Sequence, residues 1–494
     1  MLVFKMYSSW IVAVFIDAGR GKLPFHRWHP RPSSGNSRWE MMMAIERQSR
    51  ILLLVQLFPP WRTEPNTAHM VKYLGRAGCR VDVVHSLPGW GMSQAYLSHD
   101  EELEAQLPHM VRRFPRRTPN LLRGLLHLLH GYGAEAASRT VDKPGGRSLF
   151  GRLLRSVTHI PDSDSFWFWP ALREGLRLLR LRDHDLLLTS GPPFTTHLVG
   201  RLIKALTGIP WVCHHRDLYR DNPLYHPPMA WRHGLDRTLE RWVISGADGV
   251  TTVYPEATEL LRRRYGRPGQ IYRTIRNGYD EEDFSWAKAR IEREGINGDQ
   301  PFVFLHGGRL AAVESRGRTA HSLLAGFQRW LERRPELRSR VRLDLVGNVA
   351  HEYNGIAEQR GLTDVVNIDE PVLMREMIRR ELTADCLLVI LEDDPKNWFT
   401  AGGKIYECAR AGRPVLGILP ENAAARLIRE LNLGLTAPYA DDAAVAERLD
   451  ELYCAVTGGG FDYGGPARDE FVRKTSFAEL AAEFIRVFRQ VLDR

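Results

Sequence analysis

Short apolar runs alternate with amphipathic stretches along most of the chain. The run at 51–55 predicts a buried strand, the stretch at 67–77 that ends before Gly78 predicts a helix, and 81–84 predicts a second strand. Strand, helix and strand at this spacing are typical of a parallel sheet. The pattern returns in two series of predicted strands, 185–189, 211–214, 249–253 and 271–275, then 302–305, 342–346, 386–391 and 414–418, with helices between them such as 195–207 and 231–245. We therefore predict an α/β protein with two doubly wound, Rossmann-like domains that face a cleft.

Changes in composition indicate the domain boundaries. Residues 1–47 are irregular and rich in Pro, Ser and Arg, and three methionines at 41–43 precede the first strand, so we expect a disordered extension or a misplaced start. The first domain is expected at 48–283 and the second at 284–474, with a charged linker near 283–300. We expect 475–494 to form a helix that returns to the first domain.

The segment 105–160 departs from the strand and helix rhythm. Its ten Lys and Arg residues stand against only Glu135 and Asp142, and 121–130 alternates leucines with Arg123 and histidines as an amphipathic helix does. Such a helix could lie on an anionic membrane surface, or it could pack on its own domain with a solvated basic face. Nucleic acid is less favoured as a partner, because aromatic residues are not interleaved with the basic ones.

Charge and cysteine usage narrow the class of partner and compartment. The net charge of +9, from 68 Lys and Arg against 59 Asp and Glu, favours anionic ligands. The five cysteines are scattered singly, so neither a disulfide framework nor a zinc site is predicted, and a reducing cytoplasm fits best. The apolar run at 10–16 is too short to cross a bilayer.

A pair of glycines precedes Lys404 in the predicted second domain. Gly402 and Gly403 would let a phosphate approach the backbone, and a helix that begins at Lys404 would direct N–H groups and positive charge toward it. Glu407 lies one turn further on the same face and could accept hydrogen bonds from ribose hydroxyls. We interpret the segment as a nucleotide diphosphate site; the alternative is a surface Lys/Glu pair on an ordinary helix.

Four further blocks precede this segment: LLVQLFPP at 53–60, SGPPFTTH at 190–197, RDLY at 216–219 and RNGYD at 276–280. With these blocks in this order, the chain resembles a GT-B glycosyltransferase, close to glycosyltransferase family 4. The resemblance covers most of residues 50–490. It implies that the first domain binds the acceptor and that the second holds a nucleotide-sugar donor.

The resemblance implies that basic residues of the second domain clamp the diphosphate of the donor. Arg309 follows Gly308 after a strand, and Arg318 stands at the position of the family lysine, with Arg316 as the alternative. Two guanidinium groups would bind phosphate oxygens in bidentate fashion. The expected donor-binding residues are Gly308, Arg309, Arg318, Gly402, Gly403, Lys404 and Glu407.

The chain departs from the family at two places. The first of the two family glutamates, which usually contacts the donor sugar, falls on Phe399. We expect backbone amides at 400–403 or the upstream carboxylates to replace it, namely Glu392, Asp393 and Asp394. The loop at 58–67 carries Arg62 and Asn66 where many relatives place a glycine pair.

Strand ends of the first domain supply the acceptor side. His215 is the candidate to approach the reaction centre, because many relatives place a histidine after such a strand; a histidine that merely caps a loop is the alternative. Asn277 is expected in a turn at the domain junction, where Gly278 would permit a positive φ. The other acceptor-side candidates are Ser190, His197, Arg216 and Asp217, of which the last two could simply pair with each other.

The reaction implied by the resemblance is a retaining transfer without a metal or a cofactor, the nucleotide-sugar being a co-substrate. The residues expected to act in catalysis are His215, Arg309, Arg318 and Lys404, the three cations by stabilising the leaving diphosphate. The acceptor is expected to be a glycan or a lipid-linked molecule of surface polysaccharide synthesis, and the enzyme cytoplasmic or peripheral at the inner membrane face. A nucleotide-sugar epimerase of the same architecture and a non-catalytic nucleotide-sugar-binding relative remain alternatives.

Overall fold

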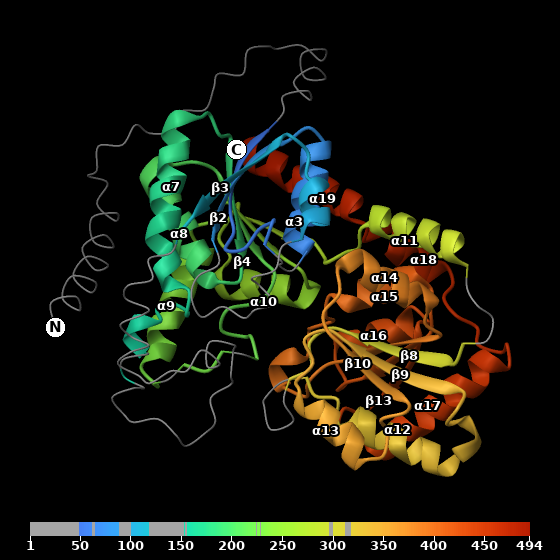
Figure 1. Cartoon of the computed structure of the whole chain (residues 1–494). Coiled ribbons are helices and arrows are strands. Elements are labelled where there is room, and N and C mark those ends of the chain that lie inside the picture. The colour runs from blue at the N-terminus through green and yellow to red at the C-terminus, as the bar shows by residue number, and fades with distance from the viewer. Residues whose placement is uncertain are drawn as a thin grey trace.

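The structure is a computed structural model of the whole chain, and it describes residues 49–61, 65–87, 100–117, 153, 156–223, 225–227, 229–295, 300–311 and 318–494. Two α/β domains are visible in Figure 1, the first mainly blue and green and the second mainly yellow and orange. Each is built on one parallel sheet. The predicted fold class, two doubly wound domains, is confirmed.

The first domain contains a seven-stranded sheet in the order β3-β2-β1-β4-β5-β6-β7. Every neighbouring pair is parallel, and Leu53 of β1 lies between Val83 of β2 and Leu188 of β4. Apolar runs form these strands because helices cover both faces of the sheet. The strands are β1 (Arg50–Leu54), β2 (Arg80–Ser86), β3 (Val111–Arg116), β4 (Leu186–Gly191), β5 (Trp211–His215), β6 (Gly249–Thr252) and β7 (Ile271–Thr274).

Two groups of helices enclose this sheet. One face packs against α3 and the C-terminal α19, whose apolar residues from Phe477 to Val491 join the core around Leu53. The other face packs against α7 and α8 through Ala171 and Val199. The helices of this domain are α3 (Pro65–Arg76), α4 (Glu101–Ala105), α7 (Phe168–Leu181), α8 (Phe194–Thr207), α9 (Arg232–Ile244) and α10 (Pro255–Tyr265).

The second domain contains a six-stranded parallel sheet in the order β10-β9-β8-β11-β12-β13. Helices α12 and α17 pack on one face, and α14, α15 and α16 lie on the side that faces the first domain (Figure 1). The strands are β8 (Phe302–Gly307), β9 (Val341–Val346), β10 (Val366–Asp369), β11 (Cys386–Ile390), β12 (Val415–Ile418) and β13 (Gly434–Ala437). The helices are α12 (His321–Arg333), α13 (Glu352–Gln359), α14 (Met374–Thr383), α15 (Lys404–Ala411), α16 (Ala423–Glu430) and α17 (Asp442–Thr457).

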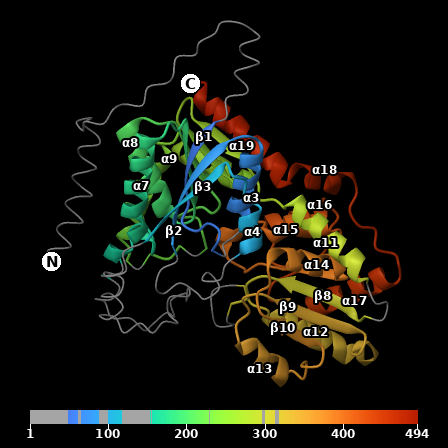
Figure 2. The same ribbon diagram turned by 45° about the horizontal axis from the view of Figure 1, so that its top comes forward.

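Three helices link the domains. Helix α11 (Glu281–Glu294) occupies most of the stretch expected as a linker, and its Phe284 packs with Ile378 of α14. Helix α18 (Pro466–Lys474) is followed by α19 (Phe477–Leu492), and Figure 2 shows these two crossing back to the first domain. At the start of α11 the buried carboxylate of Asp280 binds Lys72 Nζ at 2.5 Å and Tyr73 Oη at 2.7 Å, which ties the crossing to α3.

The basic segment 105–160 is not a separate insertion throughout. Residues Val111–Arg116 form β3, the edge strand of the first sheet, with alternating exposed and half-buried side chains. The predicted amphipathic helix at 121–130 and residues 1–47 lie outside the described residues. In the described part of the chain, no helix has the length and apolar character needed to span a membrane.

Candidate functional site

The expected phosphate clamp lies where β8 ends. Gly308 has a φ of 145°, which favours glycine, and the chain continues to the exposed Arg309. Arg318 stands on the far side of the loop, where its Nε lies 3.2 Å from the Glu392 carboxylate. Glu392, one of the expected substitutes for the family glutamate, is therefore the ion-pair partner of Arg318.

Lys404 begins α15 directly after the glycine pair. Gly402 has a φ of 74°, so this turn requires a residue without a side chain. The Lys404 ammonium lies 2.9 Å from Glu381 Oε1 on α14 and 2.8 Å from Glu407 Oε2. The predicted pairing of Lys404 and Glu407 on one helix face is present, and Glu381 adds a second carboxylate.

Glu381 is a site residue that sequence reasoning missed. It is 3% exposed, and its Oε2 has no hydrogen-bond partner among the described residues. Burial raises the pKa of Glu381 to about 7, although the Lys404 charge opposes this change. Burial acts to lower the pKa of Lys404, but Glu381 and Glu407 outweigh it and hold the lysine charged. The available signal was a glutamate at helical spacing from the apolar Met377 and Ile378.

His306 is a buried residue of β8 on which the charges of both Arg318 and Lys404 act. Burial, with a smaller contribution from the charges of Arg318 and Lys404, lowers its pKa to about 4, against the hydrogen bond to Leu388. The ring Nδ1 lies 3.1 Å from the Leu388 carbonyl and donates to it, so Nε2 is the bare nitrogen. Gly308 adjoins this nitrogen, since a Cβ at that glycine would lie 3.7 Å from it. A buried histidine at the carboxyl end of β8 therefore adjoins Gly308 and feels the charges of both Arg318 and Lys404.

Phe399 fills the place of the family glutamate with an apolar contact between the domains. Its ring is 3% exposed and lies 5.8 Å from the ring of Tyr254 at the start of α10. Burial raises the pKa of Tyr254, with Asp217 acting in the same direction and the Gly402 backbone against it. Tyr254 thus stands between the acceptor-side Asp217 and the glycine pair. Of the other expected substitutes, Asp394 accepts a hydrogen bond from the Lys396 amide.

Strand-end loops of the first domain face the glycine pair and α15. Asn66 points at Gly403, because its amide nitrogen would lie 4.0 Å from a Cβ there. Burial raises the pKa of Tyr406, and the nearby charge of Arg276 opposes this rise. Arg276 of the first domain therefore lies close to α15. Lys396 Nζ donates to two carbonyls of the first domain, those of Asn222 at 3.2 Å and Tyr225 at 3.1 Å. The carboxyl ends of the two sheets are therefore held in contact.

The acceptor-side candidates divide into buried and accessible residues. Ser190, His197 and His215 are at most 2% exposed, and burial lowers the pKa of His215 to about 4. Asp217 is exposed, and Arg216 and Asn277 line a narrow crevice shared with Arg276 and Asn66.

Gly278 does not have the positive φ that the sequence led us to expect. A Cβ there would lie 2.3 Å from the Thr475 carbonyl, so the glycine is required for space where α18 meets α19.

The comparisons with known proteins agree with this architecture. Residues 63–278 match the model of the family described as "Glycosyl transferase 4-like domain". Residues 63–278 thus resemble a glycosyltransferase 4-like domain, within a GT-B fold. No curated protein matches the chain in sequence.

Solved structures align with nearly the whole of this GT-B chain. Sucrose-phosphate synthase from Thermosynechococcus elongatus is 15% identical with a TM-score of 0.57, covering 90% of this chain and 100% of its own. HepE of Anabaena, solved in complex with UDP, is 14% identical with a TM-score of 0.56, and the alignment covers 89% of this chain and 99% of HepE. A glycosyltransferase from Rickettsia africae is 12% identical with a TM-score of 0.57, covering 91% and 100%. At these identities the likeness establishes the fold, and the resemblance to GT-B glycosyltransferases is confirmed.

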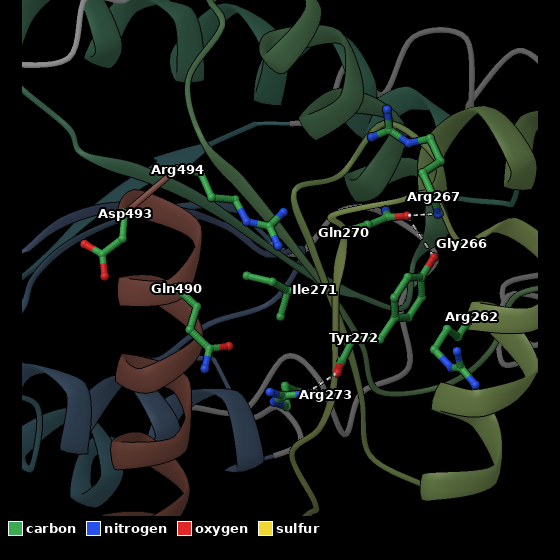
Figure 3. Close-up of a pocket in the computed structure, with 10 residues that line it drawn as sticks. All are labelled: Arg262, Gly266, Arg267, Gln270, Ile271, Tyr272, Arg273, Gln490, Asp493 and Arg494. Carbon is green, nitrogen blue, oxygen red and sulfur yellow. Dashed lines mark hydrogen bonds between the residues drawn. The ribbon is translucent and has the colours of Figure 1, made fainter.

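A wide groove of the GT-B chain lies away from this site. It has a volume of about 800 Å³ and lies between the beginning of β7 and the end of α19 (Figure 3). Four arginines line it, Arg262, Arg267, Arg273 and Arg494, with Asp493 as the acidic residue. Since it adjoins the amino end of an edge strand, it is separate from the strand ends that bear Lys404 and Arg318.

Proposed function

We propose that the protein is a retaining glycosyltransferase that moves a sugar from a nucleotide-diphosphate donor to a hydroxyl of a glycan or lipid-linked acceptor. The observation that supports it best is the arrangement of Lys404 after the glycine pair and of Arg318 near the end of β8, both close enough to the buried His306 for their charges to act on it. The glycosyltransferase 4-like match over residues 63–278 supports a transferase independently.

Charge stabilisation of the leaving diphosphate is the proposed source of most of the catalysis. Arg309, Arg318 and Lys404 would neutralise the oxygens of the diphosphate as its bond to the anomeric carbon breaks. Their charge is why the proposed reaction uses no metal. Glu407 would turn from Lys404 toward the ribose hydroxyls, and backbone amides at 400–403 would contact the sugar in place of the glutamate that Phe399 replaces.

The acceptor hydroxyl is proposed to attack from the side of the first domain. Asp217 is the better placed group to orient it, because this exposed carboxylate acts on Tyr254, which in turn reaches Gly402. The His215 ring is buried and its Nε2 lies 3.2 Å from Cys213 Sγ, so its proposed contribution is to hold the Arg216–Asp217 loop. The contacts of Tyr254 and Lys396 would exclude water and suppress hydrolysis of the donor.

The acceptor is proposed to belong to lipid-linked or surface-polysaccharide synthesis in the cytoplasm. Basic surfaces on the first domain, β3 with its arginines and the groove of Figure 3, support a peripheral contact with anionic lipid. Vesicles of anionic lipid should then retain the protein at low salt and release it at high salt. Equal retention at both salt concentrations would contradict the membrane contact and leave the transferase proposal untouched.

A product assay separates the proposal from its alternatives. The protein is incubated with each nucleotide-sugar, first alone and then with an acceptor extract from cell membranes, and the products are followed by NMR and mass spectrometry. Transfer that requires the acceptor and preserves the anomeric configuration of the donor supports the proposal. Conversion of the donor sugar without acceptor would instead identify an epimerase, and tight nucleotide binding without any product would identify a non-catalytic relative.

A further inference from the structure

Three metal-binding side chains converge behind the acceptor-side loop. His197 comes from α8, and Cys213 and His215 come from the end of β5. One ligand atom from each lies within 4.8 Å of the other two, and Cys213 Sγ is 3.2 Å from His215 Nε2. All three side chains are at most 2% exposed. No spacing rule predicts this group, because α8 and β5 are brought together only by the fold.

The His197 ring has one nitrogen held by a hydrogen bond and one without a partner among the described residues. Its Nδ1 lies 2.9 Å from Thr189 Oγ1, which also accepts a hydrogen bond from the Trp211 indole at 3.0 Å. If His197 Nδ1 donates to Thr189, Nε2 carries the lone pair, and this atom has no hydrogen-bond partner in the part of the chain that is described. A ring with one nitrogen fixed by a hydrogen bond and the other bare is the usual arrangement of a metal-ligating histidine.

This nitrogen packs closely against Gly191. A Cβ added to Gly191 would lie 2.5 Å from His197 Nε2, too close for any residue but glycine. Gly191 is absent from the glycines with positive φ, so the backbone conformation does not require it. Glycine is therefore needed here because a side chain would collide with His197 Nε2.

The other group of this kind in the described residues shows what a filled arrangement looks like. His69, Asp280 and Asp283 also approach one another, but Lys72 Nζ lies 2.5 Å from Asp280 and Arg375 Nε lies 2.8 Å from Asp283. Protein cations already neutralise those carboxylates. Among the residues that the structure describes, no Lys or Arg pairs with Cys213, and His197 Nε2 has no hydrogen-bond partner.

We propose that His197, Cys213 and His215 bind one Zn²⁺ ion, with Cys213 as the thiolate and the two imidazoles neutral. One sulfur and two ring nitrogens suit zinc, which takes such ligands in tetrahedral geometry at about 2.3 Å for sulfur and about 2.0–2.1 Å for nitrogen. Binding releases the Cys213 thiol proton to solvent, and a water would be the fourth ligand. The ion would fasten α8 to the end of β5 and so position the Arg216–Asp217 loop.

Cobalt substitution tests the site in the full-length protein. Metal is removed with a chelator, Co²⁺ is added, and the absorption spectrum is recorded before and after addition of Zn²⁺. We expect about one Co²⁺ per chain, a thiolate-to-cobalt charge-transfer band, loss of that band when Zn²⁺ displaces the cobalt, and a higher melting temperature with either ion. Absence of bound metal, or one bound Co²⁺ without a thiolate band, would overturn the proposal.

Variants locate the ion. Cys213→Ser and Gly191→Ala should lose the band and the thermal stabilisation, whereas Cys386→Ser, which changes an equally buried cysteine of the second domain, should keep both. Retention of full metal content by Cys213→Ser would place the ion elsewhere and refute the assignment. The wild-type spectrum decides the matter even if a variant does not fold, and it is independent of glycosyl transfer.

Discussion

Replacing Glu381 by glutamine tests the electrostatics of the Lys404 site most sharply. The side chain is 3% exposed and holds Lys404 at 2.9 Å, and burial raises its pKa from the ordinary 4.5 to about 7. Glu381→Gln keeps the shape of the side chain and removes its titration. The variant should therefore differ from the wild type in how stability depends on pH.

Proton linkage gives the sign and the size of the expected change in stability with pH. A carboxyl whose pKa is raised in the folded state does not lower the stability of the protein below about pH 4.5, where it is protonated in both states. As the pH rises toward 7, the unfolded chain ionises first, so the unfolding free energy falls. Between about pH 5 and pH 8 the wild type should lose about 2–3 kcal/mol of unfolding free energy through this one group. Glu381→Gln lacks this titration, so its unfolding free energy should not fall through this group over the same pH range. The difference in stability between variant and wild type should therefore shift in favour of the variant by the same amount.

Urea unfolding at about pH 5 and pH 8 measures this difference. Glu407→Gln is the matched control, because it also faces Lys404 but is less buried. A stability difference between Glu381→Gln and wild type that is the same at both pH values would refute the reasoning. It would mean that the carboxylate is solvated or fully paired in the folded protein.

Three further predictions concern the domain contact and the phosphate clamp. Phe399→Glu places a carboxylate against Tyr254 at a 3% exposed position, so the unfolding free energy should fall by about 3 kcal/mol, whereas Trp398→Glu at a 48% exposed position should change it by about 0.5 kcal/mol or less. Lys396→Met removes the hydrogen bonds to the Asn222 and Tyr225 carbonyls, and small-angle scattering should show a larger radius of gyration than for Lys474→Met; identical scattering would contradict the role of this contact. Arg318→Gln should weaken nucleoside diphosphate binding, measured by calorimetry, by about 10-fold to 100-fold. Glu392→Gln releases Arg318 from its ion pair and should tighten binding by up to about 5-fold. Weaker binding in Glu392→Gln would show that the carboxylate supports the clamp.

Much of the fold was predictable because the strands of both sheets are buried on two faces. Runs such as Leu52 to Leu54, all fully buried, leave little doubt about a strand. The strands that were missed lie at sheet edges: β3, β10 and β13 are exposed on one side and carry polar residues such as Arg112, Asn367 and Thr436. The helical character of the linker was missed because charged residues dominate the solvent face of α11, while only Phe284 and a few neighbours are buried.

The site was predictable only where residues are close in sequence. Lys404 and Glu407 lie on one helix, so their contact follows from helical geometry. Glu381 and His306 come from α14 and β8, and no local pattern places them beside Lys404. The same holds for His197 and Cys213, whose approach depends on how α8 packs over β5. Long-range contacts of this kind require the fold.

Calorimetric binding of a nucleoside diphosphate is the most direct test of a diphosphate site at Lys404. Nucleoside, monophosphate and diphosphate of each base are titrated into the wild type, Lys404→Met and Lys474→Met, the last removing an exposed lysine elsewhere. We predict that one diphosphate binds the wild type at least about 10-fold more tightly than its monophosphate, that Lys404→Met loses this preference, and that Lys474→Met keeps it. Equal affinities for nucleoside and diphosphate, or an unchanged preference in a folded Lys404→Met, would contradict the account.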